Sequence, residues 1–434
     1  MRIRKIASLL MLFSATAAMA QSGTDSPYSQ FGLGMLADQS SGYNRGMNGV
    51  SLGFHEHNQI NYLNPASYSA LDSLTFIFDV GLSGTFTNYK ENGVKKNSKQ
   101  ADFEYAIGGF RLFKNLGLGF GLIPYTNVGY SYSNTEDVPN DRNNTSTVNT
   151  YNASGGLHQL FVGLGWSPLK GLSIGMNGSY LYGDIDRSIV NSYSNSAVNT
   201  QTRYYNADVR SYKLDFGAQY TARLSKKDEM TLGVTYSLGH KIGGKPTMQL
   251  ISSNTQTSDT ITYPKAGEGN LHLETPNVLG IGLMYNHDQK LKLGFDYTLQ
   301  KWSKISEPEV QANGDEVSYN MGSDQYKDRH KFALGAVYCP GETSRKFFNR
   351  VQYKAGLSYS TPYYYINGQD GPKEFSASLG FGIPIINSWN NRSILTISGQ
   401  WVHQSAKNFI TDNSFRINVG LTFNERWFAK WKVE

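Results

Sequence analysis

The sequence contains very little cysteine and few charged residues. Its 434 residues include a single cysteine, Cys339, so no disulfide can form within the chain. Asp, Glu, Lys and Arg together make up 17% of the residues. Beyond the N-terminus there is no apolar run of about 18 residues, which excludes transmembrane helices. A transmembrane β-barrel remains compatible with this composition, because only every second residue of its strands faces lipid.

The N-terminus reads as an export signal. A basic start is followed by an apolar stretch over residues 6–13 and by the small-x-small site Ala18-Met19-Ala20, so we predict a signal peptide over 1–20. Removing its three basic residues lowers the net charge from +6 (40 basic against 34 acidic) to +3 (37 against 34). The mature chain is therefore barely basic, and nucleic acid is not expected as a partner.

From residue 74 onward, apolar and polar residues alternate repeatedly with a period of two. The polar positions are rich in Gly, Ser, Thr and Asn and poor in Lys and Glu, which favours a crowded polar lumen with the apolar face toward lipid. A soluble sandwich would instead place charged residues outside. In one such segment, Leu291, Leu293, Phe295, Tyr297 and Leu299 alternate with Lys292, Gly294, Asp296, Thr298 and Gln300.

The number of such segments is even, as bacterial single-chain barrels require. We predict an all-β protein, a transmembrane antiparallel β-barrel in the bacterial outer membrane. The fourteen predicted strands span 74–88, 101–113, 116–133, 155–167, 171–187, 205–224, 228–240, 276–286, 290–303, 327–339, 350–361, 374–386, 393–405 and 413–425.

The connections between these segments alternate in length. Outer-membrane barrels have short periplasmic turns and long external loops. Short turns such as Lys114-Asn115 are therefore placed in the periplasm. The external loops are rich in Asn, Ser and Thr, and we expect no packing pattern of their own. They include 134–154, 188–204, 241–275 and 304–326.

The remaining residues, 21–73, lack strand periodicity. They precede the first strand, and a barrel of this size needs its lumen filled. We therefore expect three parts: the signal peptide 1–20, an N-terminal plug or hatch over 21–73, and the barrel over 74–434.

Several short motifs resemble the FadL/OmpP1/TodX family of outer-membrane transport proteins. Asn64-Pro65-Ala66 is similar to the family's hatch element. A Pro, Gly-x-x-Tyr, Asp-Tyr and Trp-Ser pattern follows over 276–303, and a strand similar to the family's runs over 353–362.

This resemblance implies a fourteen-stranded barrel with an N-terminal hatch that takes up hydrophobic, long-chain fatty-acid-like molecules. In that family a kink in the third strand opens a lateral path through the wall. Pro124 matches the kink, because a proline inside a strand loses a ladder donor; an ordinary bulge is the alternative.

We also consider a second function of a different class. Some members of this fold serve as subunits or docking scaffolds of outer-membrane secretion or assembly complexes, and Pro27-Tyr28-Ser29-Gln30-Phe31-Gly32 lies outside the transporter pattern. The expected partners are thus outer-membrane lipids, a hydrophobic small-molecule ligand and other outer-membrane proteins.

Three roles are compatible with the charged residues on the predicted lumen face: they line a polar conduit, they hold the plug, or they pair with one another. We favour mutual pairing. These charged residues are Lys213, Asp215, Lys292, Asp296, Lys354 and Arg416. We predict that a set of aromatic residues forms the girdle at the membrane–water interface. They are Tyr125, Tyr130, Tyr180, Tyr182, Trp166, Trp401 and Trp427.

No catalytic residue, metal or cofactor is assigned. His55-Glu56-His57 could hold a metal, but no third ligand stands out. Ser398 and His403 lie five residues apart on one predicted strand and face opposite sides, so enzyme activity is not expected.

Overall fold

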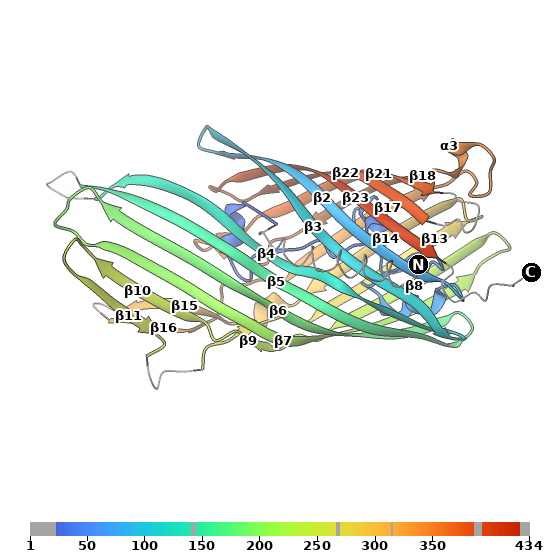
Figure 1. Ribbon diagram of the computed structural model, residues 1–434, viewed down its shortest axis with the longest axis horizontal. Helices are drawn as coiled ribbons and strands as arrows, with labels where there is room; N and C mark the ends of the chain where they lie inside the picture. The colour runs from blue at the N-terminus through green and yellow to red at the C-terminus, as the bar shows by residue number, and fades with distance from the viewer. Residues whose placement is uncertain (1–22, 140–144, 266–269, 314–315, 386–392, 426–434) are drawn as a thin grey trace, which may run out of the picture.

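The main feature of the protein is one antiparallel sheet wrapped into a barrel (Figure 1). The computed structural model describes residues 23–139, 145–265, 270–313, 316–385 and 393–425. Within these ranges, fourteen wall strands follow one another in chain order, and the last, β23, pairs with the first, β2, to close the ring.

Each predicted segment overlaps one wall strand, so the fourteen-stranded barrel is confirmed. Some bounds differ by several residues: the segment predicted over 155–167 is a strand over 146–169. The strands are β2 (Phe76–Glu91), β3 (Val94–Phe113), β4 (Leu116–Asp137), β5 (Ser146–Leu169), β6 (Leu172–Tyr193), β7 (Thr200–Arg223), β8 (Asp228–Ser237), β13 (Val278–His287), β14 (Leu291–Gln300), β17 (Arg329–Tyr338), β18 (Gln352–Ser360), β21 (Lys373–Ile385), β22 (Ser393–Ser405) and β23 (Thr411–Glu425).

The alternation along each strand separates a lipid-facing side from a lumen side. On β14, Leu293 and Phe295 are 45% and 41% exposed, whereas Lys292 and Asp296 are each 6% exposed. Successive side chains of a strand point to opposite faces, so the apolar set faces outward and the polar set faces the lumen. Apolar side chains outside and polar side chains inside are the arrangement of a barrel that is surrounded by lipid.

Two of the predicted external loops are mostly strand. The expectation that 134–154 and 188–204 lack a packing pattern is wrong, because β4 and β5 extend into the first segment and β6 and β7 into the second. The reason is cross-strand pairing between polar residues: the Asn191 amide donates to Asn149 Oδ1 at 2.6 Å on facing strands. Partners on the neighbouring strand override a composition that is typical of loops.

The longer connections also contain strands, and in Figure 1 β10 (Thr247–Ser253), β11 (Ser258–Tyr263), β15 (Glu307–Asn313) and β16 (Glu316–Gly322) lie at the end of the barrel opposite to α3 (Phe347–Arg350). β10 extends the barrel sheet beside β7. The other additional strands are β9 (Lys241–Gly243), β12 (Leu273–Glu274), β19 (Tyr365–Ile366) and β20 (Gln369–Asp370).

Residues 23–73, called the N-terminal segment below, contain only short elements: η1 (Pro27–Gln30), β1 (Met35–Leu36), α2 (Gly42–Arg45) and η2 (Pro65–Ala70). A further short helix, η3 (Trp302–Lys304), follows β14. No helix in the described ranges is long and apolar enough to cross a membrane. The predicted signal peptide 1–20 lies outside the described residues, as does Trp427.

Candidate functional site

The N-terminal segment packs against inward-facing residues of the barrel wall. Met47 and Val50 are fully buried and form one apolar cluster with Met284 of β13 and Ala333 and Val337 of β17. Contacts farther around the ring come from α2, which touches β22 and β23. The segment therefore contacts several wall strands around the ring.

The turn at Asn64-Pro65-Ala66 lies against the wall strands β5, β6 and β7. Asn64 caps η2 by accepting a hydrogen bond from Ala66 N, and its amide donates to Leu52 O at 2.8 Å. The wall makes room for it with glycine. A Cβ on Gly217 would lie 2.1 Å from Asn64 Oδ1, so only glycine fits at this close approach.

Three of the six predicted lumen residues hold the N-terminal segment. Asp296 accepts hydrogen bonds from the backbone N–H groups of Ser51 (2.6 Å) and Leu52 (2.9 Å). Lys292 pairs with Glu56, with Nζ 2.5 Å from Oε1. Mutual pairing, which we had favoured, therefore does not describe these residues, since their partners lie on the segment.

Lys354 contacts the segment through Tyr43. Its ammonium donates to the carbonyl oxygen of Tyr43 at 3.2 Å and lies 3.3 Å from the centre of the Tyr43 ring. Mutual pairing does describe Lys213 and Asp215, which form an ion pair with each other. Arg416 donates to Thr85 Oγ1 of the adjacent strand at 3.2 Å.

A further ionic contact between segment and wall, with Arg45 on the segment, was not predicted. Arg45 is 1% exposed, and its Nη2 lies 2.8 Å from Glu104 Oε2 on β3. The guanidinium also donates to Asn418 Oδ1 and to the carbonyl oxygens of Ser40 and Asp38. A buried guanidinium needs such a full set of acceptors to offset the loss of water.

The charge of Asp38 belongs to the same cluster. Burial alone would raise the pKa of this carboxyl, but the neighbouring Arg45 and Lys331 lower the pKa to about 2. Its Oδ1 accepts hydrogen bonds from the backbone N–H and the hydroxyl of Ser40. Asp38 is therefore ionised at neutral pH, beside the cations that stabilise its charge.

The residues of His55-Glu56-His57 each have a separate partner. His55 Nδ1 lies 2.6 Å from Gln219 Oε1, and His57 Nδ1 lies 2.9 Å from Asp72 Oδ2. Glu56 pairs with Lys292 on the wall. The tripeptide thus contacts three different parts of the chain.

The barrel wall has a notch between β3 and β4. The two strands pair from Phe113↔Leu116 only as far as Ala106↔Leu122, although both continue further. We call the gap between residues 94–105 of β3 and 123–137 of β4 the notch; no β3–β4 pair is present there in the described chain.

Pro124 stands where β4 leaves β3. The register between β4 and β5 shifts between Pro124 and Thr126, so Tyr125 is the extra residue of a bulge. Proline has no backbone N–H and cannot donate to the ladder. The bulge therefore falls next to Pro124, the proline that the sequence pattern indicated. It lies at the end of the notch where the pairing of β3 with β4 stops.

The N-terminal segment occupies the notch. Strand β1 pairs with the free edge of β4 through Met35↔Asn127 and Leu36↔Thr126. The backbone N–H of Ala37 donates to Tyr125 O at 3.1 Å. On the other side, the hydroxyl of Ser98 of β3 donates to Asp25. The segment thus takes the place that a wall strand would have.

A cavity of about 260 Å³ lies at this junction. Part of its lining faces the lumen, including Asp102, Glu104 and Arg416. His158 and Tyr182, also in the lining, occupy strand positions with the same parity as the exposed Leu160 and Tyr180, which face lipid. The cavity therefore reaches from the lumen to the outer side of the wall.

A second cavity of about 180 Å³ lies beside the first one. Leu36, Ala37, Asp38, Arg329 and Lys331 line both cavities. The second one continues to the polar wall residues Lys213, Asp215 and Asp296. Residues 36–38 of the N-terminal segment therefore lie between the two cavities.

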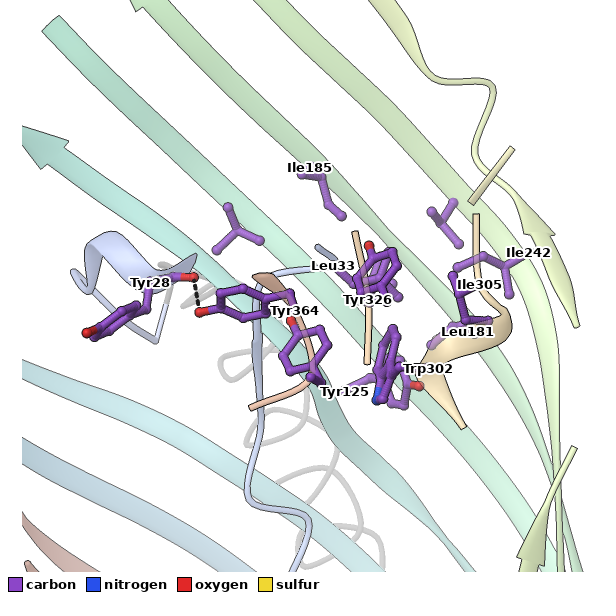
Figure 2. Packing of buried hydrophobic residues seen from close by; sticks show 14 of the residues in the cluster. Tyr28, Leu33, Tyr125, Leu181, Ile185, Ile242, Trp302, Ile305, Tyr326 and Tyr364 are labelled. Carbon is purple, nitrogen blue, oxygen red and sulfur yellow. Dashed lines mark hydrogen bonds between the residues drawn. The ribbon is translucent and has the colours of Figure 1, made fainter. Parts of the chain in front are cut away.

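The external mouth of the barrel is filled by aromatic side chains, several of which Figure 2 shows. Trp302 is fully buried, with its ring centre 4.5 Å from that of Tyr363. Phe31 stacks on Tyr364 at 5.0 Å, and the Tyr364 hydroxyl donates to Tyr28 O at 3.2 Å. We call this group, which combines the N-terminal segment with external connections, the mouth cluster.

Two predicted girdle residues belong inside instead. Tyr125 and Tyr130 are 8% and 6% exposed, and Tyr125 packs in the mouth cluster. The cause is the bulge, which shifts the strand by one residue, so that Tyr130 changes face. Tyr180, Trp166 and Trp401 are 49%, 50% and 43% exposed, as expected for a girdle.

The closed barrel, its apolar exterior and its inner segment define an outer-membrane β-barrel with the fold of FadL-like channels. The chain belongs to the BamG family, whose sequence model matches residues 2–434. No curated protein matches the sequence.

Three solved structures illustrate the shared fold. The Pseudomonas putida toluene transporter TodX is 14% identical, with a TM-score of 0.62 over 91% of this chain and 100% of its own. A Pseudomonas aeruginosa FadL homologue is 13% identical (TM-score 0.60; 91% and 99% covered). The Ralstonia pickettii toluene transporter TbuX is 12% identical (TM-score 0.59; 91% and 98% covered). The predicted family resemblance is thus confirmed at the level of fold.

Proposed function

We propose that this protein takes up small hydrophobic molecules with a polar end, such as long-chain fatty acids, through the notch between β3 and β4. The observation that carries the proposal is the cavity that reaches from the lumen to His158 and Tyr182 on the lipid side of the wall. An apolar tail can stay in the bilayer beside these residues. The polar end then enters a lining that contains Arg416 and Lys331.

In this proposal the N-terminal segment is the hatch, and β1 is its movable part at the notch. Only two residue pairs, Met35↔Asn127 and Leu36↔Thr126, join β1 to β4. Short strands with few ladder bonds open at low free-energy cost compared with a wall strand. The deeper part of the hatch stays on the wall through Asp296 and Lys292.

The names of the structural relatives add support of a coarser kind. TodX and TbuX are named as toluene transporters, and another relative is described as a monoaromatic hydrocarbon channel. Their TM-scores of 0.56 to 0.62 show a shared fold, and at 12% to 14% identity the likeness extends to the fold alone. The substrate class proposed for this chain therefore rests on the notch itself.

A disulfide between β1 and β4 tests the proposal. In a Cys339→Ser background, Met35→Cys with Asn127→Cys joins two directly paired residues and fixes β1 in the notch. We expect uptake of radiolabelled oleate by whole cells to fall in the oxidised protein and to return after reduction. The control pair, Leu293→Cys with Ala336→Cys, joins two wall strands that are already paired.

Equal uptake by the oxidised and reduced forms of the Met35–Asn127 pair would overturn the proposal, provided that the disulfide is complete. A decrease in the control pair of the same size would show that any cross-link disturbs the barrel, and would also contradict a special role of the notch.

A second candidate function is a docking scaffold in an outer-membrane protein secretion or assembly complex. The observation that favours it is the mouth cluster, in which Trp302 and Tyr364 fill this end of the barrel with the protein's own side chains. For a scaffold we expect no oleate uptake above that of cells lacking the protein. Stoichiometric co-purification of the same outer-membrane proteins with the wild type and the oxidised Met35–Asn127 variant would support the scaffold.

A further inference from the structure

The turn between β17 and β18 exposes two neighbouring phenylalanines. Phe347 is 47% exposed and Phe348 is 73% exposed, on the single turn of helix α3. The rings lie 5.5 Å apart in an edge-to-face arrangement. Such exposure of adjacent large apolar side chains in an ordered turn indicates a contact outside the chain.

The turn has a defined conformation. The backbone N–H of Gly341 donates to Asn349 O at 2.8 Å, which closes the turn at its base. The hydroxyl of Tyr353, near the start of β18, donates to Phe348 O at 3.2 Å. The exposed rings are therefore held in place and are not part of a freely moving loop.

The rings continue the lipid-facing side of the wall. Tyr338, the last residue of β17, is 49% exposed, and Leu334 on the same face is 56% exposed. Tyr353 pairs with Tyr338 across the strands. Because aromatic residues at strand ends mark the membrane–water boundary, Phe347 and Phe348 lie next to the edge of the bilayer. In Figure 1, α3 projects beside the ends of these strands.

The same turn carries an excess of positive charge. Arg345 and Lys346 are exposed and immediately precede the two phenylalanines. Neither forms a salt bridge with any residue in the described part of the chain. Glu342 is the acidic residue of the turn, and Arg350 adds a third cation. Positive side chains beside an apolar anchor attract anionic lipid headgroups.

We propose that the turn 341–350 binds anionic phospholipid in the periplasmic leaflet of the outer membrane. Phe347 and Phe348 insert at the boundary between headgroups and acyl chains. Arg345 and Lys346 bind the lipid phosphates. The turn lies on the same rim of the barrel as the short turns 114–115 and 225–227. Short connections of outer-membrane barrels face the periplasm, which places this rim at the leaflet that contains phospholipid.

Another turn on the same rim provides a matched control. The turn 225–227 carries the adjacent cations Lys226 and Lys227, but has no exposed aromatic pair. It differs also in that Lys227 lies 3.8 Å from Asp288 Oδ2, so Lys226 is the closer match to the cations of 341–350. If positive charge alone recruited the lipid, both turns would act alike. Our proposal requires the combination of rings and cations, so the two turns are expected to differ.

The first test measures lipid composition around the purified protein. Wild type, Arg345→Gln/Lys346→Gln and the control Lys226→Gln/Lys227→Gln are extracted into nanodiscs of mixed phosphatidylethanolamine and phosphatidylglycerol, and tightly bound lipid is identified by native mass spectrometry. We expect phosphatidylglycerol enrichment to fall about fivefold for each cation removed from α3's turn. The control is expected to retain the wild-type enrichment. Equal enrichment in all three proteins, or an equal fall in both variants, would overturn the proposal.

The second test identifies what contacts the rings in the native membrane. A benzophenone amino acid replaces Phe348 and is irradiated in whole cells. An adduct with phospholipid, seen by mass spectrometry, is the expected result. A discrete adduct with another protein as the main product would mean that the turn is a protein-docking surface, and would overturn the lipid assignment.

Discussion

Replacing Arg45 by methionine is expected to loosen the N-terminal segment from β3. The methionine side chain has a similar length but no N–H donors. Glu104 then stays buried and keeps only the hydrogen bond from the Ser83 hydroxyl. Removing one partner of a buried ion pair costs about 3–5 kcal/mol, because the other charge is left uncompensated. The variant also loses three hydrogen bonds to other acceptors of the guanidinium.

This free energy should appear as local opening. A cost of about 3–5 kcal/mol raises the equilibrium constant for opening by roughly a hundredfold or more. Hydrogen exchange of the backbone amides of residues 38–52 should accelerate accordingly, measured by mass spectrometry on the protein in detergent. Exchange in β13 and β14 should not change, since their ladder does not involve Arg45.

A double variant separates the ion pair from general damage to packing. Arg45→Met combined with Glu104→Gln removes the uncompensated charge, so exchange of residues 38–52 should slow again relative to Arg45→Met alone. Unchanged exchange of these residues in Arg45→Met would refute the reasoning that the ion pair holds the segment. Faster exchange throughout the barrel would also contradict it.

Two further predictions concern the wall and the topology. Gly217→Val should destabilise the packing of Asn64 by about 1–3 kcal/mol, because there is no room for a side chain at this position. The effect should be seen as faster proteolysis of the N-terminal segment. Gly178→Val, where a Cβ meets open space, is the control and should behave as wild type. Epitope tags inserted in 241–275 should be labelled on whole cells and tags in 225–227 should not; the reverse pattern would overturn the orientation of the barrel.

The wall of the barrel was predictable because its signal is local. The alternation from Leu291 to Gln300 places each residue on its observed face, and β14 spans that same stretch. Every wall strand repeats this period of two, so the count and approximate bounds follow from the sequence. The ends of β5 and β6 were missed because Asn149 and Asn191 stabilise each other across strands, which a single segment does not reveal.

The candidate site was predictable only in part. Pro124 marked the bulge, since proline cannot donate to a ladder. The end of pairing at Leu122 and the seat of β1 on β4 depend on contacts between distant segments. Arg45 and Glu104 lie 59 positions apart, and no pattern near either residue indicates the pair. The inward turn of Tyr130 likewise required knowledge of the bulge.

The most direct measurement is the conductance of single barrels in planar bilayers, compared between wild type and a variant that lacks residues 23–60. That stretch includes β1 and α2, the parts of the segment that occupy the notch and bind β3. We expect the variant to fold, because the wall strands pair without the segment, and to conduct ions far better than wild type. Unchanged conductance in a correctly folded variant would contradict the claim that the N-terminal segment closes the barrel.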